Sequence, residues 1–96
     1  MLMEFEWDEN KNRQNQQKHG INFEEAKEIF QGIYFTAIDD RYDYGEIREI
    51  GIGTIRGTVI VTAIYTDRNG KIRLISARKA TPKERKQYND YLRRTT

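Results

Sequence analysis

The stretch Lys71–Arg85, KIRLISARKATPKER, decides the predicted fold of the chain. It follows Asn69-Gly70, the strongest short signal for a β-hairpin, because a type I′ turn needs positive φ at both central residues. Lys71–Arg78 then has the length and the apolar content of a strand. The segment TPKE at 81–84 closes the stretch as a capping box with proline at the first helical position. The sequence therefore predicts a hairpin, a strand and a helix in direct succession.

Composition limits the classes of protein to consider. The chain has 96 residues and no cysteine, so we expect one domain, residues 1–96, without disulfides or thiolate metal ligands. The N-terminal segment lacks the basic-then-apolar order of a signal peptide, and no apolar run reaches the length of a membrane span. These features predict a cytoplasmic protein with no membrane association.

Charge is distributed unevenly along the chain, although the net charge is only +2. Acidic residues crowd the first half, whereas lysine and arginine outnumber them from Thr54 onward. The basic residues of this second half are Arg56, Arg68, Lys71, Arg73, Arg78, Lys79, Lys83, Arg85, Lys86, Arg93 and Arg94. Such a basic half indicates a face that binds a polyanion, and a well-solvated surface is the alternative interpretation.

The remaining elements are predicted from caps and from apolar periodicity. A first helix, Glu9–His19, has no apolar stripe but is preceded by Asp8 as N-cap and followed by glycine. A second helix starts after the Asn22 cap, with an apolar stripe that runs to Ile33. Strands are expected at Ile33–Asp39, Glu46–Ile55, Thr58–Thr66 and Lys71–Arg78, a loop at Arg41–Gly45, and a last helix from Pro82 to about Arg93. The predicted class is α+β, with two N-terminal helices, a four-stranded antiparallel meander sheet and a C-terminal helix.

Hairpin length predicts which side chains share a face of this sheet. Two-residue turns in both hairpins would place Arg48 directly opposite Tyr65 and Arg78 beside Val61. Arg73 is then expected on the opposite face. One residue more in the first hairpin loop would turn Arg48 away from Tyr65.

Short motifs follow one another in a fixed order along the chain. They are FEWD at 5–8, KHG at 18–20, FEEA at 23–26, EIR at 46–48, YTDR at 65–68 and ISAR at 75–78. As an ordered set they resemble the BrnT family. The resemblance implies a RelE-like fold, ribonuclease activity that inhibits translation, and a type II toxin–antitoxin pair. It also implies a BrnA-type antitoxin whose ribbon-helix-helix part binds operator DNA. Tyr65 departs from the pattern, because many relatives have histidine there.

Metal-free RNA cleavage needs a base for the 2′-hydroxyl, an acid for the leaving oxygen, and cations that stabilise the phosphorane. Arg48, Arg73 and Arg78 are candidates for the last role, because a guanidinium keeps its charge and binds two phosphate oxygens. Alternatively, each of them only flanks a strand or pairs with Glu46 or Glu49. For Arg78, which lies between an apolar strand and a capped helix, a functional role is favoured.

Two side chains are candidates for the proton transfers. Tyr65 is usable only if neighbouring arginines lower its pKa, and it alternatively lies at the edge of the core. His19 is the only histidine and alternatively caps the first helix. Trp7 either stacks an RNA base or anchors that helix. Lys79 and Arg85 are further candidates for RNA contacts.

The sequence predicts neither a cofactor nor a metal site, because one histidine and dispersed carboxylates lack the spacing of ligands. The expected partners are RNA and the antitoxin; a homodimer and a heterotetramer are candidate assemblies, and the sequence leaves the oligomeric state open. The competing class is a non-catalytic domain that binds RNA or a protein partner.

Overall fold

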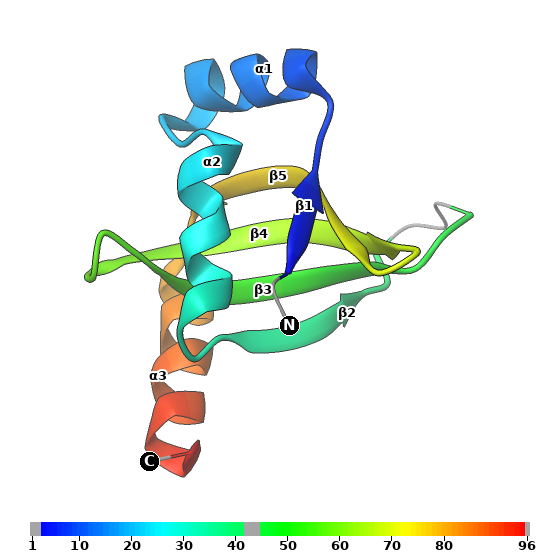
Figure 1. Cartoon of the computed structure of the whole chain (residues 1–96). Coiled ribbons are helices and arrows are strands. Elements are labelled where there is room, and N and C mark those ends of the chain that lie inside the picture. Colours follow the sequence, from blue (N-terminus) through cyan, green and yellow to red (C-terminus); the bar gives the residue numbers. More distant parts are fainter. Residues whose placement is uncertain (1–2, 42–44, 96) are drawn as a thin grey trace.

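The computed structural model describes residues 3–41 and 45–95, so part of the predicted loop Arg41–Gly45 lies outside the described residues. Five strands form one mixed sheet in the order β1-β5-β4-β3-β2 (Figure 1). The elements are β1 (Glu4–Glu6), α1 (Glu9–His19), α2 (Phe23–Ala26), the 3-10 helix η1 (Lys27–Gln31), β2 (Phe35–Asp39), β3 (Arg48–Ile55), β4 (Val59–Arg68), β5 (Lys71–Lys79) and α3 (Pro82–Thr95). The α+β class is confirmed. Within the described ranges, no helix combines the length and the apolar character needed to cross a membrane.

The predicted four-stranded antiparallel sheet is wrong in one strand. β2 to β5 form the expected meander, but β1 adds to β5 in parallel, with Glu6 beside Arg73. β1 has only three residues, too few for a period-two pattern to be recognised in the sequence. Its strand conformation depends on pairing with β5, which is distant in the chain.

The second helix also differs from the prediction. Its capping box between Asn22 and Glu25 is present, but α2 ends at Ala26 and the chain continues in the tighter 3-10 form to Gln31. The predicted limits of the four meander strands and of α3 differ from the observed ones by one or two residues. The four meander strands and α3 are therefore of the predicted type, and only their limits change.

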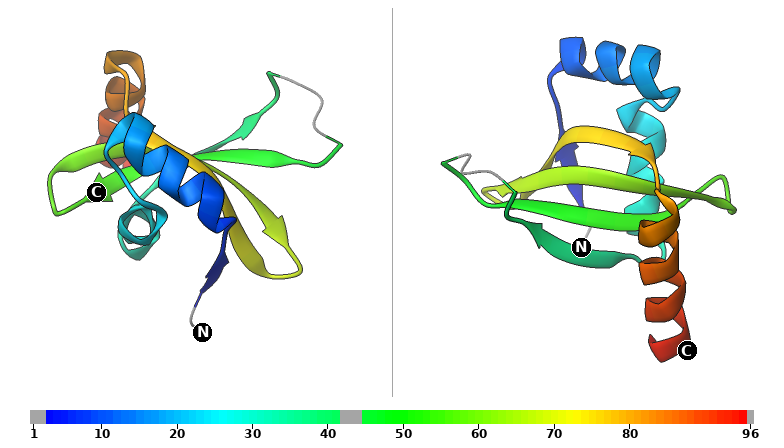
Figure 2. Two further views of the ribbon diagram at one scale, coloured as in Figure 1. Left: turned by 90° about the horizontal axis from the view of Figure 1, so that it is seen from above. Right: turned by 180° about the vertical axis from the view of Figure 1, so that it is seen from behind.

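Helices cover the two faces of the sheet unequally (Figure 2). On one face, Phe23 and Phe30 of the α2–η1 segment pack with Val61 and Tyr65. On the other face, α3 lies against one end of the strands, where Tyr88 is buried. The right-hand view of Figure 2 shows no other helix of the described chain over that face.

α1 lies along the edge of β5, and the hydrogen bonds that it makes there account for its polar composition. Asn15 is buried, donates to the Ala77 carbonyl oxygen at 2.7 Å and accepts from the Ala77 N–H at 3.1 Å. Asn12 accepts from the Phe23 backbone N–H at 2.7 Å. Asn15 thus satisfies backbone groups that an uncovered strand edge would leave unpaired, and Asn12 satisfies an N–H of the first turn of α2 that has no partner within the helix. The predicted helix and its caps at Asp8 and Gly20 are confirmed.

The register of the β3–β4 hairpin differs from the prediction by one residue. Arg56 and Gly57 have the positive φ of a type I′ turn, 53° and 77°. Pairing nevertheless resumes only at Ile55 and Val59, which leaves Thr58 as an extra residue. This single residue shifts every predicted pair of the two strands by one position. Because side chains alternate between faces, Arg48 and Tyr65 consequently point to opposite faces of the sheet.

A second irregularity lies in β5. On its N-terminal side, Leu74 pairs with Tyr65 as predicted. On its C-terminal side, Ser76 pairs with Ile64, so Ile75 is an extra residue that forms a β-bulge. Arg78 consequently lies opposite Thr62, and not beside Val61 as predicted.

Candidate active site

The two register changes place the three predicted arginines on one face of the sheet. Arg73 and Arg78 lie opposite Thr66 and Thr62, two residues of β4 that point to the same face. Arg48 points to that face too, because its neighbour Glu49 pairs with Tyr65 on the other one. The expectation that Arg73 lies apart from the other two was wrong. The two threonines are four residues apart, which is about 13 Å along the strand, so the arginines form a row and not a compact site.

Each of these arginines is paired with a carboxylate. Arg73 Nη1 lies 2.8 Å from Glu6 Oε2, and Arg48 Nε lies 3.8 Å from Glu46 Oε1. Arg78 pairs with a different carboxylate, Glu84, at 2.7 Å. An RNA phosphate would compete with these carboxylates for the guanidinium groups.

The pair between Arg78 and Glu84 is bidentate and part of a larger network. Arg78 donates to both carboxylate oxygens, at 2.7 and 3.0 Å, and Glu84 also accepts from the Thr62 hydroxyl and the Thr81 backbone N–H. Burial alone raises the pKa of Glu84, but the hydrogen bonds from Arg78, Thr81 and Thr62 outweigh it and lower this pKa to about 2. Arg78 therefore has a structural role, in a pair with Glu84 and not with Glu46 or Glu49.

Tyr65 lies in the core, with 3% of its surface exposed. Its ring packs edge-on against Phe30 at a centroid distance of 5.1 Å, and its strand partner is Glu49. Burial raises the pKa of Tyr65, and the charge of Glu49 adds to the effect. The predicted contact with Arg48 and the predicted lowering of the pKa were therefore wrong, and the basis for a role of Tyr65 in proton transfer is removed.

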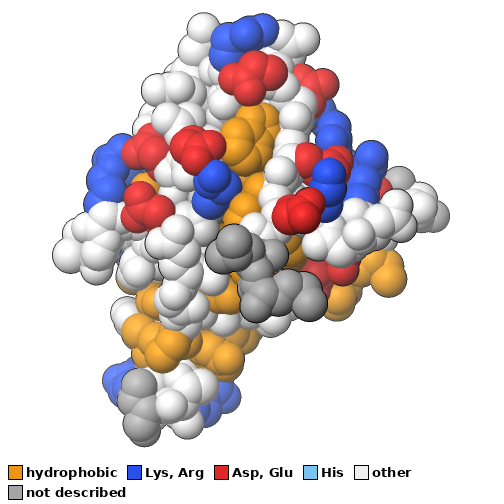
Figure 3. Space-filling view, in the orientation of Figure 1, with side chains coloured by type: hydrophobic (Ala, Val, Ile, Leu, Met, Phe, Trp, Pro, Cys, Tyr) orange, Lys and Arg blue, Asp and Glu red, His pale blue; other side chains and the backbone are white. Residues whose placement is uncertain are grey.

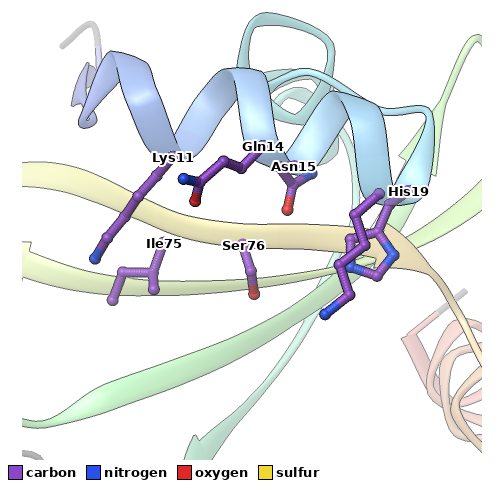
Figure 4. Close-up of a pocket in the computed structure, with 7 residues that line it drawn as sticks. Lys11, Gln14, Asn15, His19, Ile75 and Ser76 are labelled. Carbon is purple, nitrogen blue, oxygen red and sulfur yellow. The ribbon is translucent and has the colours of Figure 1, made fainter.

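A polar pocket of about 260 Å³ lies between α1 and β5 (Figure 4). It is lined by Lys11, Gln14, Asn15, Lys18, His19, Ile75 and Ser76. Figure 4 shows the labelled side chains of α1 extending from the helix toward the bulged part of β5. The bulge thus shapes the floor of the pocket, and the polar side of α1 forms its wall.

The charges of this pocket are not neutralised locally. Lys11 and Lys18 are both exposed. In residues 3–41 and 45–95, no carboxylate lies within ion-pair distance of either lysine, and none lines the pocket. The pocket therefore differs from the arginine row, because its cations are available to an external anion.

Among the residues that line the pocket, His19 is the one whose ordinary pKa lies near neutral pH. Burial lowers the pKa of His19, and the positive charges of Lys18 and Arg78 lower it further. The end of α1 is capped by the Gly20 backbone N–H, which donates to the Gln16 carbonyl at 2.8 Å. The lowered pKa of His19 favours the neutral imidazole, which can accept a proton as a general base must.

The other predicted RNA contacts are more dispersed. Lys79 is exposed at the end of β5, and Arg85 is exposed in the first turn of α3. Trp7 packs against Phe23 with a centroid distance of 6.0 Å and donates to Glu9 Oε2 at 3.1 Å. The Trp7 ring therefore helps to fasten the start of α1 to the core, which was the alternative interpretation.

Sequence reasoning missed Lys11, Lys18 and Ser76. The two lysines and Asn15 recur at helical spacing on one side of α1, a signal that was present in the sequence. For Ser76 no local signal exists, because its neighbours depend on the bulge. Among the described residues, no three carboxylate, histidine or cysteine side chains gather as a metal site would require.

The fold and this pocket define a small α+β protein with a cationic edge of the kind that suits a polyanion. The family model of the ribonuclease toxin BrnT of type II toxin–antitoxin systems matches residues 7–84, and the chain belongs to this family. A similar solved structure is the Brucella abortus ribonuclease toxin BrnT, at 27% identity and a TM-score of 0.63. The match covers 83% of this chain and 99% of the Brucella chain. No curated protein sequence matches.

Proposed function

We propose that this chain is an endoribonuclease that cleaves RNA without a metal ion, inhibits translation in the cytoplasm, and is neutralised by a BrnA-type antitoxin. Its membership of a ribonuclease toxin family supports RNA as the substrate. The observation that carries the proposal is the α1–β5 pocket, where a histidine with a lowered pKa lies beside lysines that no carboxylate pairs with among the described residues.

In this mechanism, neutral His19 takes the proton from the 2′-hydroxyl of the substrate. The 2′-oxygen attacks the adjacent phosphorus, the bond from phosphorus to the 5′-oxygen breaks, and a 2′,3′-cyclic phosphate forms. The leaving 5′-oxygen takes a proton from an ammonium group of the pocket or from water. Lys11 and Lys18 stabilise the extra negative charge of the phosphorane. The paired arginines contribute less to phosphate binding, because the phosphate must first displace their carboxylate partners.

The antitoxin neutralises the enzyme by covering this pocket and the basic residues around it. An acidic segment suits that role, because it presents the charge that an RNA backbone would present. Lys79 and Arg85, both exposed, belong to the surface that such a segment would contact.

Incubation of the purified chain with RNA in the presence of EDTA tests the proposal. We expect cleavage that survives chelation and yields cyclic phosphate ends, and its loss in a folded His19→Gln variant. Cleavage that requires added metal would contradict the metal-free mechanism. Binding without cleavage would support the competing class, a non-catalytic RNA-binding domain.

A further inference from the structure

The β-bulge at Ile75 gives the α1–β5 pocket a floor that a regular strand would not have. Ile75 and Ser76 are successive residues, which point to opposite faces in a regular strand, yet both line the pocket. The bulge therefore sets an apolar side chain next to a hydroxyl. Bulges often re-aim a side chain beside a functional site in this way. The proposed cleavage reaction uses His19 and the lysines, and it leaves Ile75 and Ser76 without a role.

The wall of the pocket carries an amide that has no partner. Gln14 lies three residues after Lys11 and four before Lys18, so the three side chains share one side of α1. Figure 4 shows Gln14 on the helix above β5, between Lys11 and His19. In residues 3–41 and 45–95, neither the Gln14 amide nor the Ser76 hydroxyl has a hydrogen-bond partner.

This combination of groups suits a nucleobase. A base has an apolar face, which can lie on Ile75, and polar edges, which can bond Gln14 and Ser76. Single-stranded RNA makes such bases available, because they can be splayed out of the stack. The pocket volume of about 260 Å³ lies just below the usual range of small-molecule sites, which fits one base and not two.

The charge of the pocket decides which base is favoured. An amide pairs with any base, because every base has a donor next to an acceptor on one of its edges. The ammonium groups of Lys11 and Lys18 only donate. Guanine presents two adjacent acceptors to them, O6 and N7, whereas adenine sets an amino group beside N7. An ammonium has three N–H donors, so one lysine can bond a base and a phosphate oxygen together.

Carboxylates close to the pocket are engaged elsewhere. Glu84 pairs with Arg78, the charge of which reaches His19. Figure 3 shows a different arrangement on the face that carries α2, where acidic side chains lie beside lysines and arginines. There Arg56 pairs with Glu25. Within the part of the chain that the structure describes, the ammonium donors of the α1–β5 pocket therefore have no carboxylate as a competitor for the base.

We propose that the α1–β5 pocket binds one base of the RNA beside the cleaved phosphate, and that it binds guanine more tightly than adenine. Ile75 supports the face of the base, Gln14 and Ser76 bond its edges, and the lysines bond O6 and N7. This inference rests on the proposed function, because it takes RNA as the ligand.

Nucleoside 5′-monophosphates test this preference without any cleavage, because all of them carry the same phosphate. GMP, IMP, AMP, CMP and UMP are titrated separately into the ¹⁵N-labelled chain. IMP retains O6 and N7 and lacks only the 2-amino group of guanine. We expect GMP and IMP to bind at least about fivefold more tightly than AMP, with shifts at residues 11–19 and 75–76. Equal affinities, an IMP as weak as AMP, tighter binding of CMP or UMP, or no binding at all overturns the proposal.

Variants test the side chains that bond the base. Gln14→Leu and Ser76→Ala should each weaken GMP binding by about threefold or more, because each removes a hydrogen bond. Gln17→Ala changes an exposed side chain of α1 outside the pocket and should not. Unchanged affinity in both pocket variants overturns the proposal.

Mapped cleavage sites of the parent chain connect the base to the reaction. They should have guanine more often than adenine next to the broken bond, and equal frequencies overturn the proposal. Failure of the parent to cleave any RNA would instead contradict the proposed function and leave the nucleotide affinities to stand.

Discussion

His19 is the residue on which the chemistry of the α1–β5 pocket depends. Its surroundings supply positive charge and partial burial, and both favour the neutral imidazole. A base that is already neutral at physiological pH needs no prior deprotonation before it takes a proton from RNA. Lys18, whose charge helps to lower this pKa, also lines the pocket and is placed to bind the phosphate.

We predict that kcat/KM for RNA cleavage falls on acidification only below pH 6.5, the ordinary pKa of histidine, because the pKa of His19 is lowered. His19→Gln should reduce the rate by roughly a hundredfold or more and abolish this acid limb. Gln17→Ala, an exposed change on the same helix, is the control and should keep the parent profile. An acid limb centred above 6.5, or one that persists in His19→Gln, would assign the proton transfer elsewhere.

Glu84 links the arginine row to the start of α3. Because its pKa is lowered from 4.5 to about 2, its contacts stabilise the fold fully above pH 4.5, and that contribution is lost as the pH falls toward 2. Glu84→Gln should lower the free energy of unfolding at pH 7 by about 1 kcal/mol, since the pair is partly exposed, and flatten its pH dependence in that window. Urea titrations from pH 2 to 7 measure both effects. The control is Glu24→Gln, an exposed carboxylate of α2 that should change stability by less than about 0.5 kcal/mol.

Tyr65 belongs to an aromatic cluster around Phe30, which also contacts Phe5 and Tyr34. Tyr65→Phe retains the ring that fills this cluster. The hydroxyl that it removes does not line the α1–β5 pocket. We expect the variant to cleave RNA at the parent rate in a single-turnover assay. A loss of roughly a hundredfold in a folded Tyr65→Phe protein would restore the hydroxyl as an acid or base.

At the scale of elements, η1 packs closely against β3 at Gly53. A Cβ built at Gly53 would lie 2.9 Å from Ile29 Cβ and 3.2 Å from the Ile29 carbonyl oxygen. The backbone of η1 cannot move away without disturbing Phe30, the centre of the aromatic cluster. Glycine is therefore required here for close approach, and not for an unusual φ.

Gly53→Ala should consequently destabilise the protein by about 1–3 kcal/mol, the usual cost of overpacking. Gly32→Ala is the matched control, because no atom lies within 4 Å of its Cβ position and its φ is −116°. The midpoint of urea unfolding distinguishes the two variants. Equal midpoints would show that η1 shifts freely over β3.

At the scale of the whole molecule, positive charge is concentrated where α1 lies against β5. The pocket there is lined by Lys11 and Lys18 and, among the described residues, by no carboxylate, whereas Glu46, Glu49 and Asp67 line a separate pocket. This separation explains how a chain with a net charge of only +2 can present a strongly cationic surface to RNA.

The salt dependence of RNA binding tests this distribution. For single-stranded RNA, each lost phosphate contact should reduce the slope of log K against log salt by about 0.7. The double variant Lys11→Ala/Lys18→Ala should therefore reduce the slope by about 1.4. Lys71→Ala removes an exposed lysine of β5 that faces Glu4, and it should leave the slope unchanged. A slope unaffected by the double variant would place the RNA on another surface.

The sequence by itself determined the features that depend on residues close together in the chain. Asp8, Asn22 and Thr81 start their helices as predicted, because a capping side chain bonds backbone groups two or three residues away. The Asn69-Gly70 turn has positive φ at both residues for the same local reason. Family membership, read from ordered short motifs, was likewise accessible and is confirmed.

Only the tertiary structure decided which side chains meet. Thr58 outside the ladder and Ile75 in a bulge each add one residue, and one residue reverses the face of every side chain that follows. Thr58 puts Arg48 on the face of Arg73 and away from Tyr65, and Ile75 puts Arg78 on that same face. The α1–β5 pocket likewise depends on Asn15 bonding to Ala77, 62 residues later in the chain. Such contacts leave no local pattern, because their energy comes from backbone groups that become neighbours only when the sheet is complete.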